Sequence, residues 1–392
     1  YYELYTKFGD VPYTTKVLSI KESMSIARTA KATVIANVLA DLDEVINGNY
    51  LPTSYDADNK GRITRWAAMA IKAKIYLFEG NWTQVKNITS TIMTEGGFRL
   101  FGSYAGLFEI ANEYNSEVIL DAQYRPTSRE HQMMYAFLPP SLGGYSQLSP
   151  LQELVDSYIM LDGKTIRETG TSFDESNPYA NRDPRLKATV MYTGNSYTLA
   201  DGTEVVINCE KGEGKDGYGV GSDCSATGYY IKKYWDNTYR ATLYSGLNPI
   251  LIRYADILLM NAEALAELGE LDKTAWDATI KPIRDRAGFT LASAVEFPEG
   301  ASKDKLIEIV RNERRSELAL EGHRHKDIIR WRIADDVLNG WCHGLKTNEV
   351  VGTDNGYVRV ENRAFNANKH YLWPIPQAER DLNGNLVQNP NW

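Results

Sequence analysis

Apolar residues recur at three- and four-residue spacing along much of this chain, which is the pattern of helices that bury one face. Residues 25–46 show it clearly, and Gly48 follows with the chemistry of a helix end. Residues 64–79 predict a second helix that stops at Gly80, and residues 81–95 predict a third. The N-terminal part of the chain is therefore predicted to be helical.

Two stretches share one plan: a helix, a glycine and a second helix. Residues 64–95 match the tetratricopeptide repeat at several of its spaced positions, namely Ala73, Tyr76, Gly80, Trp82, Val85 and Thr89. Residues 253–288 repeat the plan. We therefore predict a mainly α fold in which tetratricopeptide-like helical hairpins form the scaffold, with long loops and a few short strands.

The stretch 98–250 has a different pattern. Short alternating runs predict strands, and long polar loops rich in Gly, Tyr, Asn, Ser and Pro separate them. The predicted strands are residues 117–124, 187–192, 204–208 and 229–234. A loop-rich stretch of this length inside a helical protein is costly unless it performs a function. We therefore expect the ligand-binding region within residues 98–250.

Helical periodicity returns at residues 303–338, and the tail from Tyr371 is rich in Pro and Asn. No low-complexity linker divides the chain, which predicts a single domain over residues 1–392. Within it we distinguish an N-terminal portion with the helical repeat, residues 1–97, from a C-terminal portion, residues 98–392.

The charge of the chain argues against one class of protein, and its first residues indicate how the chain begins. With 43 basic against 51 acidic side chains and a net charge of −8, the chain lacks the excess of Lys and Arg that a nucleic-acid reader needs. No apolar run reaches the roughly 18–20 residues that span a bilayer. The chain opens at Tyr1, in what we interpret as the end of a helix, without an initiator Met. We expect a fragment or a processed chain, so a missing targeting segment does not indicate location.

The three cysteines leave two alternatives open. Cys209 and Cys224 flank a Gly-rich loop and could form one disulfide in an oxidising compartment, with Cys342 free. Three free thiols are the other alternative. No C-x-x-C pair is present for zinc or redox chemistry.

Three motifs resemble ligand sites only in part. Residues 212–217 satisfy G-x-G-x-x-G, but no helix follows, so we predict a hairpin loop and no nucleotide site. Residues 56–61 resemble the first half of a calcium loop, but Lys60 stands at a ligand position, which favours an Asx-rich turn. His323 and His325 are two residues apart and would point away from each other on a helix, which argues against a zinc site.

A carboxylate array at four-residue steps comprises Glu313, Glu317 and Glu321, with arginines interleaved. Acids in register with bases usually form ion pairs that tie helices together, so we assign this array to structure. The G-x-S-x-G and H-E-x-x-H motifs are absent from the sequence. We therefore predict no catalytic set and no cofactor.

The aromatic composition is uneven, with 25 Tyr and 8 Trp against 10 Phe. Rings held on loops over a rigid frame can stack on sugar rings, while nearby Asn and Asp side chains bind the hydroxyls. Some of these rings instead pack the loops onto the helices. The candidate ligand-binding residues are Tyr135, Tyr145, Tyr179, Asn181, Asp183, Trp235 and Tyr239.

Five phrases occur in order along the chain: Phe8-Gly-Asp-Val-Pro12, Gly61-Arg-Ile-Thr64, Arg253-Tyr-Ala-Asp256, Glu313-Arg-Arg-Ser-Glu317 and Tyr371-Leu-Trp-Pro374. Together they resemble the SusD/RagB family of outer-membrane nutrient-binding lipoproteins. Because the phrases run from residue 8 to the C-terminal tail, the resemblance covers essentially the whole chain.

The resemblance implies a tetratricopeptide-like scaffold whose irregular loops hold the ligand. It implies a non-catalytic protein that captures oligosaccharides, or in some members peptides, for a SusC-like TonB-dependent transporter over which it sits as a lid. It also implies a surface-exposed place on the outer membrane through a lipid anchor that is not present in this chain. The segment that carries the anchor would also supply part of the usual ligand site.

Two other functions remain open. A glycoside hydrolase would place two carboxylates about 5–9.5 Å apart in a cleft. A peptide- or protein-binding helical-repeat module would bury its tyrosines and would not bind sugars.

Overall fold

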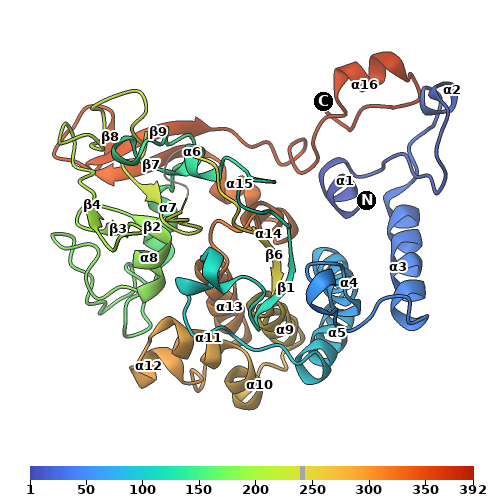
Figure 1. Cartoon of the computed structure of the whole chain (residues 1–392), viewed down its shortest axis with the longest axis horizontal. Coiled ribbons are helices and arrows are strands. Elements are labelled where there is room, and N and C mark those ends of the chain that lie inside the picture. The colour runs from blue at the N-terminus through green and yellow to red at the C-terminus, as the bar shows by residue number, and fades with distance from the viewer. Residues whose placement is uncertain (239–242) are drawn as a thin grey trace.

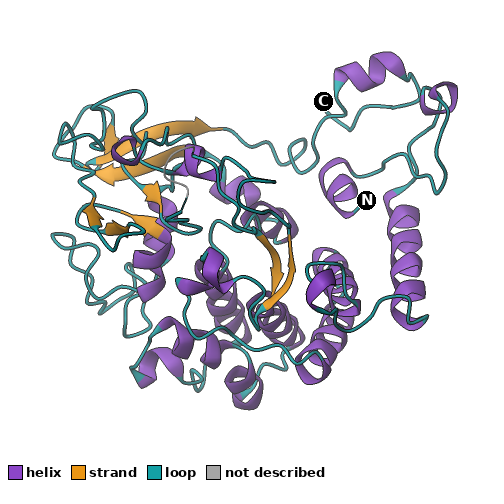
Figure 2. Cartoon of the chain, viewed as in Figure 1, coloured by secondary structure: helices purple, strands orange, loops and turns teal. Residues whose placement is uncertain are grey.

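The computed structural model describes residues 1–238 and 243–392, and helices dominate this part of the chain (Figures 1 and 2). The α-helices are α1 (Tyr2–Phe8), α2 (Ile20–Ser23), α3 (Lys31–Asn47), α4 (Arg65–Phe78), α5 (Trp82–Glu95), α6 (Met133–Phe137), α7 (Gln152–Ser157), α8 (Pro184–Thr189), α9 (Tyr254–Leu268), α10 (Lys273–Ala278), α11 (Ile280–Ala287), α12 (Ala292–Val295), α13 (Lys303–Glu317), α14 (Arg324–Arg330), α15 (Ala334–Val337) and α16 (Gln377–Leu382). The strands are β1 (Val118–Asp121), β2 (Val190–Met191), β3 (Ser196–Thr198), β4 (Glu204–Val206), β5 (Tyr230–Ile231), β6 (Ile250–Arg253), β7 (Gly340–Lys346), β8 (Thr353–Asp354) and β9 (Tyr357–Arg363).

A row of helices forms the scaffold, because α3, α4, α5, α9 and α13 each pack against the next. The α4–α5 hairpin is the predicted 64–95 block. Thr64 caps α4 by accepting from the backbone N–H of Ala67, and Asn81 caps α5 in the same way. Ala70 and Ala73 are fully buried, which lets the neighbouring helices approach closely. This prediction is confirmed.

The second predicted hairpin, residues 253–288, has a divided second helix. Helix α9 is buried on nearly every side and ends at Gly269, which adopts a left-handed φ of 75°. The chain then forms α10 and α11, which meet at Thr279. Pro282 explains the division, because its ring would clash with the carbonyl four residues earlier in a continuous helix.

In the part of the chain that the structure describes, the strands form four small antiparallel sheets, β1–β6, β2–β5, β3–β4 and β7–β9–β8. The predicted strand at 187–192 is wrong over its first half, because Asp183 caps α8 and Pro184 starts it. The predicted strands at 204–208 and 229–234 shrink to β4 and β5. The sheet of residues 340–363, at the upper left of Figure 1, was not predicted.

The C-terminal tail returns to the N-terminal segment (Figure 1). The backbone N–H of Trp373 donates to the Lys7 carbonyl at 2.7 Å. Arg28 reaches the carbonyl of Val387 and the side chain of Asn389, both at 2.6 Å. Within the described residues, no helix has both the length and the apolar character that crossing a bilayer requires.

The partial ligand motifs take the forms expected of ordinary loops. Residues 57–59 form a 3-10 turn that Asp56 caps, and residues 212–217 lie in a turn-rich loop between β4 and β5. Cys209, Cys224 and Cys342 are all free thiols, so Cys209 and Cys224 do not pair in this structure. Within the described residues, no group of three or more His, Cys, Asp or Glu side chains is arranged to hold a metal ion.

Candidate functional site

Two of the predicted ligand residues stack on each other at the surface. Helix α6 carries Tyr135, and the loop that follows folds back so that the N–H of Tyr145 donates to the Tyr135 carbonyl at 2.9 Å. The two rings are nearly parallel, with centroids 4.1 Å apart and planes 25° apart, and 41% of Tyr145 is exposed. Gly144 permits this fold, because a Cβ there would overlap the carbonyl oxygen of Leu138.

Two further tyrosines lie on chain segments that meet just before α6. An antiparallel bridge between His131 and Ser245 brings Tyr244, which is 41% exposed, beside the start of α6. The ring of Tyr124 meets His131 edge to face at 4.7 Å, and the guanidinium of Arg129 lies 5.3 Å above the Tyr124 ring. We call Tyr124, Tyr135, Tyr145 and Tyr244 the aromatic surface. Neither Tyr124 nor Tyr244 was among the candidate ligand-binding residues named from the sequence, where Tyr124 was the last residue of the predicted strand 117–124.

Tyr179 is largely a packing residue. Its ring stacks on Tyr192 with centroids 4.0 Å apart, and its hydroxyl lies 3.2 Å from that of Tyr229. Burial raises the pKa of Tyr179 above its ordinary value. Because Tyr192 covers one face of the ring and Tyr229 contacts its hydroxyl, we interpret Tyr179 mainly as a core-packing residue.

The two polar candidates lie in different environments. Asn181 is exposed with a left-handed φ of 56°, and its carbonyl accepts from the N–H of Leu161 at 2.8 Å. Asp183 is 1% exposed, caps α8 and pairs with Arg185 at 2.7 Å. The prediction that Asp183 binds a sugar is therefore wrong, because its carboxylate has no access to a ligand.

Trp235 is half-buried. Its indole N–H donates to the Thr198 carbonyl at 2.9 Å, and its ring lies 4.8 Å from Tyr197. Tyr239 lies outside the described residues. Of the seven predicted residues, the structure thus brings Tyr135 and Tyr145 into contact with each other and gives Tyr179, Asp183 and Trp235 packing or capping partners.

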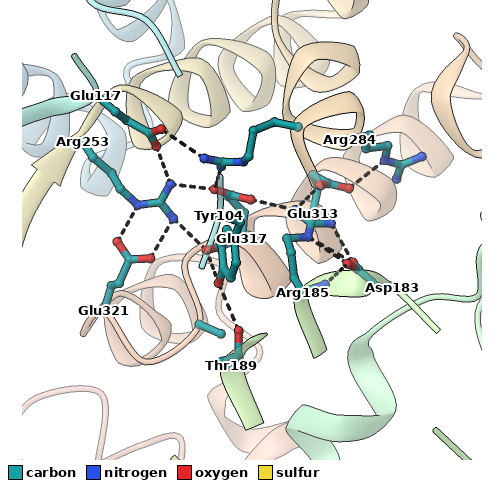
Figure 3. A network of polar contacts seen from close by, with 12 residues as sticks. Tyr104, Glu117, Asp183, Arg185, Thr189, Arg253, Arg284, Glu313, Glu317 and Glu321 are labelled. Carbon is teal, nitrogen blue, oxygen red and sulfur yellow. Dashed lines mark hydrogen bonds and ion pairs between the residues drawn. The ribbon is translucent and has the colours of Figure 1, made fainter. Parts of the chain in front are cut away.

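The carboxylate array of α13 and the turn after it is buried in ion pairs (Figure 3). Arg253 contacts Glu117 at 2.7 Å, Glu317 at 2.6 Å and Glu321 at 2.7 Å. Arg185 joins the same network by contacting Asp183, Glu313 and Glu317, as Figure 3 shows for the first two. The arginines outweigh burial and hold the pKa of Glu317 well below its ordinary value. The structural role assigned to this array is confirmed, because a general acid needs a raised pKa and access to substrate.

A second carboxylate pair, Glu113 and Asp121, is linked to Tyr124 through Asn248. Asn248 donates its backbone N–H to Glu113 at 2.8 Å and its side-chain amide to Asp121 at 3.2 Å. The side-chain carbonyl of Asn248 accepts from the N–H of Tyr124 at 2.6 Å. Burial raises the pKa of Glu113 and of Asp121. A raised pKa is one requirement of a general acid and distinguishes this pair from the array of α13, but Asp121 is only 7% exposed and is held by Asn248.

Comparison with known proteins agrees with this architecture. Residues 107–392 match the SusD family, and residues 1–77 match a family described as starch-binding and associating with the outer membrane. SusD-like protein P25 of Formosa agariphila is 28% identical over 414 residues, covering 99% of this chain and 69% of that protein. SusD-like protein P2 of the same organism is 27% identical and covers 99% of this chain and 71% of that protein.

Solved structures show the same fold. A SusD-like carbohydrate binding protein from Bacteroides fragilis superposes with a TM-score of 0.87 at 30% identity, over 98% of this chain and 77% of that one. A laminarin binding SusD-like protein shares the fold at a TM-score of 0.65 and 24% identity, over 100% of this chain and 76% of that one. The predicted mainly α scaffold with long loops is thereby confirmed. By its sequence over most of its length, this chain belongs to the SusD family.

Proposed function

We propose that this protein binds an oligosaccharide at the outer-membrane surface, without catalysis, and delivers it to a TonB-dependent transporter. The observation that carries the binding step is the stacked pair of Tyr135 and Tyr145, which presents an exposed, rigid ring on the loop-rich region. The outer-membrane location is supported by the family that residues 1–77 match.

The chemistry of the aromatic surface suits a sugar. Flat rings offer an apolar face with a hydroxyl at the edge, which complements the apolar face and the hydroxyl rim of a pyranose. Asn181 is exposed and remains in the proposed set as a polar partner. Each hydrogen bond to a sugar replaces one to water, so we expect modest affinity from preformed rings. Carbohydrate-binding relatives in the family support this assignment.

A glycan array tests the proposal with the wild type and with Tyr135→Ala and Tyr145→Ala. Loss of one stacked ring at ~1–1.5 kcal/mol should weaken binding roughly five- to tenfold. Tyr50→Ala is the control, because Tyr50 is 67% exposed and belongs to the linker before α4. If the wild type binds no glycan, or if both variants bind undiminished, the aromatic surface is not the site.

The alternative functions give different results in the same samples. A peptide-binding module would select peptides from a mixed array and leave the glycans unbound. A hydrolase would release reducing ends from a bound polysaccharide. Glu113→Gln and Asp121→Asn test the two carboxylates with raised pKa values for that activity, and loss of release in either variant would favour the hydrolase. Delivery is a separate step, tested by co-purification of the full-length lipoprotein with its transporter.

A further inference from the structure

A cavity of about 670 Å³ lies among α7, α13, α14, α15 and β7, and shares no lining residue with the aromatic surface. Its volume falls in the range of about 300–1,000 Å³ typical of small-ligand sites. The walls combine apolar side chains with cations, and these include Leu318, Ile328, Leu338, Trp341, Arg315 and Arg324.

Arg315 and Arg324 are the feature that sets this cavity apart. Among the described residues, neither guanidinium has a carboxylate within ion-pair distance, and Arg315 instead donates to the carbonyl of Glu153 at 2.5 Å. Both residues also line a second cavity beside Trp331, so they lie between the two cavities. Burial and the positive charge of Arg324 lower the pKa of Arg315 to about 10.

The neighbouring carboxylates are occupied by other cations. Asp327 pairs with Arg314 at 3.0 Å and with Arg330 at 2.8 Å. The carboxylate of Glu153 accepts from His343 at 2.8 Å. Asp336 also lines the cavity but is exposed, where water screens its charge. Within the described residues, Arg315 and Arg324 are therefore partly buried positive charges that acidic groups reach only at a distance, and an anion in the cavity would pair with them directly.

The other residues that line the cavity indicate which kind of ligand would bear the anionic group. Trp341 is 43% exposed and offers an indole face, while His325 and Asn339 add polar groups. Burial and nearby lysines lower the pKa of His325, which favours the neutral ring, and a neutral imidazole can accept a hydrogen bond. An aromatic face with a few polar groups suits a ring that carries hydroxyls.

We propose that this cavity is a second binding site, in which Arg315 and Arg324 hold the acidic group of an anionic sugar while its ring lies against Trp341. A planar guanidinium matches a carboxylate or a sulfate with paired hydrogen bonds. The site would give the protein a preference for acidic glycans that the uncharged tyrosines of the aromatic surface do not supply.

Titration calorimetry with three small probes tests this site: D-glucuronate, glucose 6-sulfate and glucose. At least one acidic sugar should bind, more weakly as salt rises, and glucose should bind at least tenfold more weakly, because a hydrogen bond to a charged group is worth roughly 1.5–3 kcal/mol. Acetate should also bind more weakly than the acidic sugars. Equal binding of glucose, equal binding of acetate, or no binding at all would overturn the proposal.

Variants locate the binding. Arg324→Gln and Arg315→Gln should each weaken the acidic sugar tenfold or more. Arg324→Gln should not lower the melting temperature, since it removes the repulsion between Arg324 and Arg315, whereas an arginine with a purely structural role would lower it. Arg315→Gln also removes the hydrogen bond to the Glu153 carbonyl, so the stability comparison is made with Arg324→Gln. Arg167→Gln is the control, because that arginine is 83% exposed and paired with Asp156.

The two binding proposals can fail separately. Tyr135→Ala should leave the affinity for the acidic monosaccharide unchanged, and Arg324→Gln should leave neutral-glycan binding unchanged. Undiminished binding of the acidic sugar to Arg324→Gln would overturn the second site without affecting the aromatic surface.

Discussion

Replacing Glu321 by Gln tests how strongly the buried ionic network stabilises this protein. The Glu321 carboxylate is 2% exposed and accepts both Nε and Nη2 of Arg253 at 2.7 Å. It also accepts from Lys233 at 2.6 Å. Gln has the same shape but no charge, so Arg253 and Lys233 would lose a buried counter-charge without leaving a cavity.

The pKa of Glu321 gives the expected loss in the free energy of unfolding. Burial raises the pKa, but Arg253 and Lys233 outweigh it and lower the value from 4.5 to about 2. At about 1.36 kcal/mol per pKa unit, the charged form contributes roughly 3 kcal/mol to the free energy of unfolding at pH 7. Because the folded pKa is depressed, this contribution is complete above pH 4.5 and falls away as the pH drops toward 2. About half of it should remain at pH 3.

Urea unfolding measures the effect, followed by far-UV circular dichroism and tryptophan fluorescence, whose transitions should coincide. We expect Glu321→Gln to lose about 3 kcal/mol at pH 7 and visibly less at pH 3. Glu361→Gln is the control, because Glu361 is 61% exposed beside Arg363 and should cost under about 0.5 kcal/mol. A loss below about 1 kcal/mol, or one that does not shrink in acid, would refute the reasoning.

Three further changes probe other contacts, each by urea unfolding. The ring of His343 contacts two carboxylates, which raise its pKa although burial opposes them. His343→Gln should therefore lower the free energy of unfolding by about 0.5–1 kcal/mol at pH 5.5 and by little at pH 8.5. Equal losses at the two pH values would contradict this. A Cβ at Gly228 would overlap Leu345, and φ is 74°, so Gly228→Ala should cost at least ~2 kcal/mol, whereas Gly102→Ala, in open space, should be nearly neutral. Thr64→Ala removes the cap of α4 and should cost about 1 kcal/mol, and a value near zero would show that water replaces the cap.

Local signals in the sequence were sufficient to predict the helices of the scaffold. Helix α4 follows from the cap at Thr64, its buried alanines and the stop before Gly80, and each of these signals lies within the helix or directly beside one of its ends. The failures were also local in origin. Alternation at 187–192 suggested a strand, although Asp183 and Pro184 already carried the signal of a helix start. The sheet at 340–363 has weak alternation, and its strands form through pairing with each other.

The sequence did not separate the proposed binding residues from tyrosines that pack the loops. Tyr145 and Tyr179 are both loop tyrosines, but one presents its ring to solvent and the other is held between Tyr192 and Tyr229. The sequence does show an excess of tyrosine and tryptophan over phenylalanine, which made the loop rings candidates for binding. Which rings these are depends on how the loops fold back, as at Gly144.

For the ionic network, too, the sequence predicted one part and only the tertiary structure showed the other. The interleaving of acids and arginines on residues 313–324 is enough to predict ion pairs. Only the tertiary structure shows that Arg314 reaches Asp327 while Arg315 and Arg324 are left facing a cavity. Helix propensity, capping and periodicity act between residues a few positions apart, so the sequence by itself determined the helical frame. Burial and charge pairing act between segments that meet only after folding, so the tertiary structure decided which aromatic and charged side chains remain available to a ligand.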